Sequence, residues 1–188
     1  MKLSRLAIAL FAVLLSLACK SAPQTQPPAT TTASAGTAEN YPNLMVKAKE
    51  ISDAFSNKDY LKALELTYPK VVEIGGGRDK MIATMREEIK KMEAEGVALR
   101  SAVPGPATQI LNESGSIYAV VPMTLKMKTQ TGTYQADATL IGISPDAGTS
   151  WTFIDAAGED DADLKVLPQT VLSKLKLPPE KDPIKVAN

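Results

Sequence analysis

The chain has 188 residues, with 21 basic and 21 acidic side chains, a single cysteine and no histidine. These counts exclude a Ser–His or Cys–His dyad, a Cys/His zinc site and a disulfide framework. The balanced charge gives no basic patch of the kind that binds nucleic acid. Acid–base chemistry in this chain would rest on Asp, Glu, Lys or Tyr.

The N-terminus has the pattern of an export signal. Lys2 and Arg5 flank the start of an apolar run over residues 6–17, which is too short to span a bilayer and ends at Ala18 and Cys19. The SLAC tetrapeptide at 16–19 resembles the lipobox of bacterial lipoproteins, although the favoured leucine three residues before the cysteine is a serine here. The resemblance implies cleavage after residue 18 and acylation of Cys19. An ordinary cleaved signal with a stray cysteine is the alternative.

The next segment, residues 19–40, is predicted to be a lipidated cysteine followed by a disordered tether. It is rich in Pro, Thr, Ala and Ser and has no large apolar residue, so it cannot bury enough surface to offset the cost of ordering. A glycosylated stalk is the alternative. The 148 residues from 41 to 188 are enough for one domain with its own core. Lys20 after the cysteine, where the resemblance associates Asp with inner-membrane retention, favours the periplasmic side of the outer membrane.

Three helices are predicted at the start of this domain. Apolar residues recur at helical spacing over about 43–56, again after Asp59 as an N-cap until Pro69, and most clearly over about 78–95. The glycines at 75–77 lack the residues of a phosphate-binding loop and are predicted to lead flexibly into the third helix. The stripe of that helix, interpreted as core, comprises Met81, Ile82, Met85, Ile89 and Met92.

After Gly96 the apolar pattern changes to a period of two, which predicts an antiparallel meander. Its strands are expected at about 99–103, 108–112, 117–128, 134–144 and 151–155. Pro122 within the long third strand predicts a sheet edge or a bulge. A short C-terminal helix is expected before the prolines at 178 and 179, with its apolar positions at Leu167, Val171, Leu172 and Leu175.

The turn before the last strand reads SPDAGTSW, residues 144–151. It resembles the Asp-box of sialidases and related propellers, in which the aspartate accepts backbone hydrogen bonds, the glycine adopts a costly conformation and the tryptophan packs below. Propellers repeat the box over several blades, whereas this chain has one copy. Asp146, Gly148 and Trp151 are therefore interpreted as structural turn and anchor residues without a catalytic role.

The order of three helices followed by a meander resembles the NTF2-like superfamily, which includes the SnoaL and ketosteroid isomerase families. The resemblance covers about residues 41–157 and is carried by the segments Leu44–Phe55, DYLKAL at 59–64, YAVVP at 118–122 and WTFID at 151–155. It implies an α+β fold in which a curved antiparallel sheet forms a cone around a pocket.

Two classes of function follow from this resemblance. The favoured one is a non-catalytic envelope lipoprotein, held at the membrane by its lipid, that binds an apolar ligand or another envelope protein, with homodimerisation as a further expectation and no cofactor. The alternative is a pocket enzyme of the isomerase or cyclase type, using Asp and Tyr. Its candidate pocket residues are Tyr118, Tyr134 and Asp137.

A metal site is a third alternative. The acidic run GEDDAD at 158–163 supplies oxygen ligands that calcium prefers, but the spacing of an EF-hand and its terminal glutamate are missing. No metal is therefore predicted, and the run is interpreted as a solvated loop.

Overall fold

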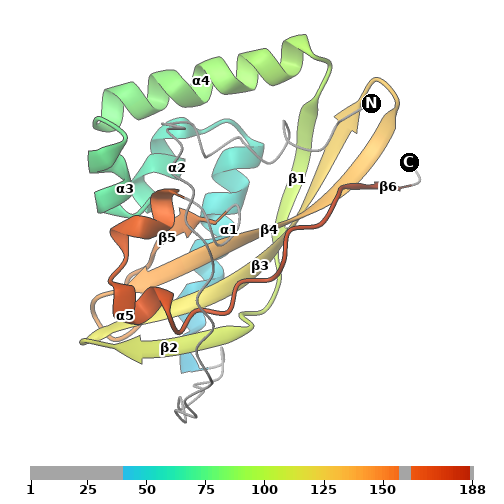
Figure 1. The fold of residues 1–188 in the computed structure, drawn as a ribbon. Coiled ribbons are helices and arrows are strands. Elements are labelled where there is room, and N and C mark those ends of the chain that lie inside the picture. The colour runs from blue at the N-terminus through green and yellow to red at the C-terminus, as the bar shows by residue number, and fades with distance from the viewer. Residues whose placement is uncertain (1–39, 157–161, 187–188) are drawn as a thin grey trace, which may run out of the picture.

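The computed structural model describes residues 40–156 and 162–186. It is an α+β fold in which helices precede a strongly curled antiparallel sheet, a half-barrel (Figure 1). The helices are α1 (Pro42–Ser56), α2 (Tyr60–Leu66), α3 (Pro69–Ile74) and α4 (Arg78–Ala94). Among the described residues, no helix is both long and apolar enough to cross a bilayer.

The sheet is built on two long paired strands, β3 (Ser116–Thr129) and β4 (Gly132–Ser144). Each carries two short strands along its outer edge. On β3 these are β1 (Ala98–Pro104) and β2 (Gln109–Glu113), and on β4 they are β5 (Thr152–Asp155) and β6 (Ile184–Val186). Because the short strands follow one another with a gap between them, the sheet can bend sharply at both edges.

Pro122 lies opposite one of these gaps. Its strand has neighbours on both sides, so the predicted edge position is wrong for β3 as a whole. Locally, however, the pairing of β1 with β3 ends at Met123, and the pairing of β2 with β3 ends at Val120. Pro122 lies between these two points. The carbonyl of Pro122 accepts the N–H of Gly105 at 2.8 Å. The N–H and C=O of one strand residue point to the same side, so the donor that proline lacks would face this junction, where the ladder is interrupted.

The concave face of the sheet holds the main core. Helix α1 has apolar residues at spacings of four and three, and it buries Leu44, Ala48 and Ile51 against residues that alternate along β3, such as Ala119 and Val121. The N–H of Ala102 on β1 donates to the Ser56 hydroxyl at the end of α1, at 3.1 Å. Helix α1 thus also satisfies a donor on the exposed edge of the sheet.

The outer face of the sheet is covered over only part of its length. Val120 and Ile141 pack there against Val71 of α3 and Val171 of the short helix α5 (Gln169–Leu172), which follows the 3-10 turn η2 (Ala162–Val166). The predicted C-terminal helix is thus present, although it is short. From α5 the chain crosses to the far edge of β4 and ends in β6, as Figure 1 shows. The sequence patterns predict neither η2 nor β6.

The region after α2 differs from the prediction of three helices. Pro69 begins the extra helix α3 instead of only ending α2, because proline is tolerated in a first helical turn, where its missing N–H has no partner to lose. Helix α2 begins as predicted with Asp59 as N-cap, whose carboxylate accepts the N–H of Lys62 at 3.1 Å. Gly77 is the N-cap of α4 with φ +91°, in keeping with the predicted glycine lead-in.

Candidate functional site

A cavity of about 90 Å³ lies between α4 and the concave face of the sheet. Helix α4 packs on α2 and α3 and reaches β1 across the open side of the curl (Figure 1). The walls of the cavity come from α1, α2, α4, four strands and the segment before β6. The lining residues are Phe55, Tyr60, Met85, Ile89, Met92, Leu99, Ala102, Met123, Leu125, Met127, Asp137, Ala138, Thr139, Asp155, Ala156, Pro178, Pro179, Glu180 and Lys181.

The two long walls are apolar because of simple periodicities. Met85, Ile89 and Met92 are spaced by four and three on α4 and therefore share one helical face. Met123 and Met127 are separated by an even number of residues on β3 and therefore share one face of the sheet. Unbranched thioether side chains adapt to irregular shapes, so these walls suit a flexible apolar guest.

The polar end of the cavity lies at the gap between β5 and β6. Strand β4 pairs with β6 up to Gln135 and with β5 from Leu140, so no strand of the described part of the chain pairs with the outer side of the stretch between them. The carbonyl of Thr139 accepts the N–H of Ala156 at 2.8 Å. Here the segment Pro178–Lys181, which we call the strap, borders the cavity. An exposed ion pair of 3.1 Å joins Lys181 to Asp137 of β4.

The strap is fixed on the side of α5. The side chain of Gln109 on β2 donates to the carbonyl of Lys174 and accepts the N–H of Lys176, each at 2.8 Å. The ammonium of Lys174 also pairs with Glu113 at 2.6 Å. On the other side, β6 continues the sheet. The strap is therefore held at both ends, and an ion pair joins its Lys181 to Asp137 of β4 in the middle.

The three candidate pocket residues do not come together. Asp137 lines the cavity at its polar end, where its side chain is half exposed. Tyr118 is buried on the outer face, and its pKa is raised, first by burial and then by the nearby Tyr68 phenol. It pairs with Ile143, six residues along β4 from Asp137, or about 20 Å. Tyr134 pairs with Met127 and so lies on the concave face, but it is not among the lining residues, and its hydroxyl is 3.2 Å from that of Thr131; Asp137 pairs with Thr124 and lies on the other face.

Sequence reasoning missed most of the cavity. The stripe of α4 is visible in the sequence, but its spacing does not distinguish a core stripe from a cavity wall, and the interpretation as core alone was incomplete. The pair of methionines on β3 facing the pair on α4 was the available signal. No sequence pattern indicated the strap, because residues 178–181 reach the site only through the path of the chain after α5.

The SPDAGTSW turn has a tight internal network. The Asp146 carboxylate accepts the hydroxyl of Ser144 at 2.8 Å and both the N–H and the hydroxyl of Ser150, at 2.9 and 2.6 Å. These bonds, the hydroxyl of Ser150 foremost, lower the pKa of Asp146 to about 2. Gly148 has φ +92°, and its carbonyl accepts the indole N–H of the buried Trp151 at 3.1 Å.

This turn also anchors the start of α1. The ring of Tyr41 meets Trp151 edge-on with centroids 6.0 Å apart, and the amide of Asn43 donates to the Thr149 carbonyl at 3.0 Å. All of these contacts are internal to the fold. The geometry therefore gives Asp146, Gly148 and Trp151 places in a structural clamp at the start of α1.

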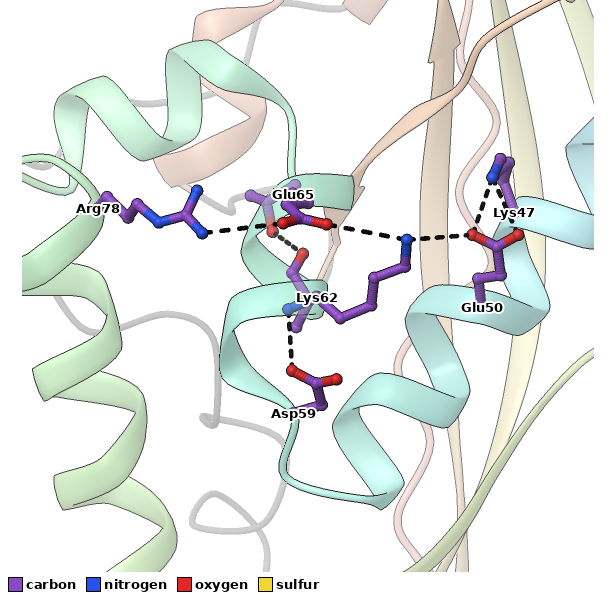
Figure 2. A network of polar contacts seen from close by, with 8 residues as sticks. Lys47, Glu50, Asp59, Lys62, Glu65 and Arg78 are labelled. Carbon is purple, nitrogen blue, oxygen red and sulfur yellow. Dashed lines mark hydrogen bonds and ion pairs between the residues drawn. The ribbon is translucent and has the colours of Figure 1, made fainter.

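A chain of charges on the helical surface is shown in Figure 2. Glu50 of α1 pairs with Lys47 at 2.9 Å and with Lys62 of α2 at 3.7 Å, and Lys62 continues to Glu65 at 3.8 Å. Arg78 at the start of α4 ends the chain, 3.9 Å from Glu65. The hydrogen bond from Lys47 is the main cause of the lowered pKa of Glu50. The network connects three helices and does not border the cavity.

Two features of the sequence lie largely outside the described residues. Cys19 is one, and most of the acidic run at 158–163 is the other. Within residues 40–156 and 162–186, no group of three or more His, Cys, Asp or Glu side chains is arranged to hold a metal ion.

Comparison with known proteins found no matching family model, no matching curated protein and no matching solved structure.

Proposed function

We propose that this protein is a bacterial envelope lipoprotein whose domain, residues 41–188, is an NTF2-like cone that binds an apolar ligand without catalysis. The observation that carries the binding function is the cavity between α4 and the sheet. Its two long walls are apolar, and its polar groups gather at one end. Ligand sites in proteins commonly combine an apolar lining with a few polar groups that fix orientation.

The place of action rests on the N-terminal sequence. The apolar run ends in Ala18–Cys19 and is followed by a segment rich in Pro and Thr. This pattern is typical of an acylated cysteine followed by a linker. The 21 residues from 20 to 40 would span about 25 Å as a flexible chain. The domain would then work in the periplasm, close to the outer membrane that holds it.

The isomerase-like alternative requires a carboxylate in an apolar environment, because burial is what raises the pKa of a catalytic acid or base. Among the described lining residues the carboxylates are those of Asp137, Asp155 and Glu180, and none of the three is buried. Tyr118 and Tyr134, the expected donors, do not line the cavity. This arrangement favours binding over proton transfer.

The test uses the mature full-length chain with Cys19→Ser, which removes the acylation site and gives a soluble protein. We expect the fluorescence of the apolar probe N-phenyl-1-naphthylamine to rise on binding. Ala138→Phe should abolish the rise, because the new ring fills the cavity from the sheet. Val46→Phe is the matched control, since Val46 is 55% exposed on α1 outside the cavity.

The binding function would be refuted if the probe gave no signal. It would also be refuted if Ala138→Phe, shown to be folded by circular dichroism, gave the same signal as the unsubstituted chain. The anchor is tested separately with the wild-type chain. Its intact mass should show cleavage before Cys19 and added acyl groups, and the protein should fractionate with the outer membrane. A Cys19→Ser chain that is still retained there would refute lipid anchoring.

A further inference from the structure

Methionine is concentrated at the cavity. The chain has seven methionines, and six belong to the domain when Met1 is set aside. Four of these six line the cavity, two from α4 and two from β3, namely Met85, Met92, Met123 and Met127. Among the described lining residues, the leucines and isoleucines are fewer: Ile89, Leu99 and Leu125. The commonest large apolar group that a guest would meet is therefore a thioether.

The four methionines belong to the interior of the cavity. All of them are buried, with at most 8% of each residue exposed. The sulfur of Met123 lies 3.3 Å from the hydroxyl of Ser52 on α1. Within residues 40–156 and 162–186, no hydrogen bond engages the sulfurs of Met85, Met92 and Met127. These three sulfurs can therefore contact a guest without losing a polar partner.

Thioether sulfur favours one kind of apolar guest. It is polarizable, and it makes favourable contacts with aromatic rings at about 5 Å, often at the ring edge. Each such contact would strengthen binding by about two- to tenfold. Phe55 of α1 and Tyr60 of α2 also line the cavity, and aromatic rings attract one another edge-on or in offset stacks. A saturated guest of the same size would gain neither interaction.

From the four thioethers and the two rings we propose that the ligand carries an aromatic ring, and that this ring lies between the methionines of α4 and those of β3. This inference rests on the proposed binding function and names the ligand class for the same cavity. The sulfurs, and not apolar area alone, then select the ligand.

The experiment compares two competitors with the same skeleton, 2-phenylethanol and 2-cyclohexylethanol. Each displaces N-phenyl-1-naphthylamine from the mature Cys19→Ser chain. The saturated compound is the more apolar of the two, so burial of apolar surface alone would favour it. We expect the aromatic compound to bind at least about threefold more tightly.

The double variant Met92→Leu with Met127→Leu removes two of the sulfurs at nearly constant volume, a kind of exchange that cores tolerate well. It should lower the ratio of the two affinities by about threefold or more. Met45→Leu is the matched control, because Met45 packs against the main core and does not line the cavity. It should leave the ratio unchanged. Circular dichroism checks that both variants are folded.

Nuclear magnetic resonance of methionine methyl groups locates the ring. The ring current of bound 2-phenylethanol should shift the methyl signals of the four lining methionines and leave that of Met45 in place. Equal or tighter binding of 2-cyclohexylethanol would overturn the aromatic class, as would displacement of the probe by neither compound. A ratio unchanged in the double variant would overturn selection by sulfur. If the probe itself does not bind, the proposed function fails first.

Discussion

Replacing Gly148 by alanine tests whether the SPDAGTSW turn clamps the start of α1. Two separate costs apply. A side chain at φ +92° is disfavoured by about 1–2 kcal/mol relative to glycine. In addition, a Cβ on residue 148 would lie far inside van der Waals contact with Cδ1 of Tyr41, so the ring must move. Displacing Tyr41 sacrifices its edge contact with Trp151, and such aromatic contacts contribute about 0.5–1.5 kcal/mol.

Gly115→Ala supplies the matched control, because Gly115 has φ +81° but no atom within 4 Å of the place that an alanine Cβ would take. Its free energy of unfolding should fall only by the conformational cost of placing an alanine at positive φ. We therefore expect Gly148→Ala to lose about 1.5–3.5 kcal/mol in total, which exceeds the control by the aromatic contribution. Urea unfolding measures both losses, and Trp151, the single tryptophan, reports on the clamp by fluorescence.

Equal losses in the two variants would refute the reasoning. That result would mean that Tyr41 moves aside freely and that the turn does not hold the first residues of α1. A loss in Gly148→Ala accompanied by a changed dependence on urea would indicate an altered unfolded state instead.

Three further outcomes are expected. The pKa of Asp146 in the folded protein is about 2, below its ordinary value of 3.8. The stabilising contribution of this carboxylate is therefore present above pH 3.8 and is lost as the pH falls towards 2. Over this interval the urea midpoint should fall more steeply in the wild type than in Asp146→Asn. Gly142→Ala should cost about 1–3 kcal/mol in thermal unfolding, because its Cβ would lie 3.0–3.2 Å from three core side chains. Lys62→Met should cost less than about 1 kcal/mol, since its ion pairs are exposed, and a loss above about 2 kcal/mol would contradict this.

The elements that the sequence predicted well are those that depend on near neighbours in the chain. The stripe of α4, the Asp59 cap and the turn around Asp146 each involve residues within about four positions of one another, so their pattern is visible without the fold. The prediction failed at Pro69, where proline is compatible both with ending one helix and with starting another. At Pro122 it was right only locally, because β3 has neighbours on both sides and the interruption beside this residue depends on where β1 and β2 stop.

The sequence by itself determined the helical and strand periodicities, the lack of histidine and thiol chemistry in the domain, and the apolar N-terminal run that ends in a cysteine. Only the tertiary structure decided that β5 and β6 leave a gap along β4, that the strap borders this gap, and that Tyr118 and Asp137 lie far apart. The physical reason is that a cavity is a property of pairing between distant segments. Local periodicity fixes which face of each element is apolar, but it does not fix how closely two such faces pack.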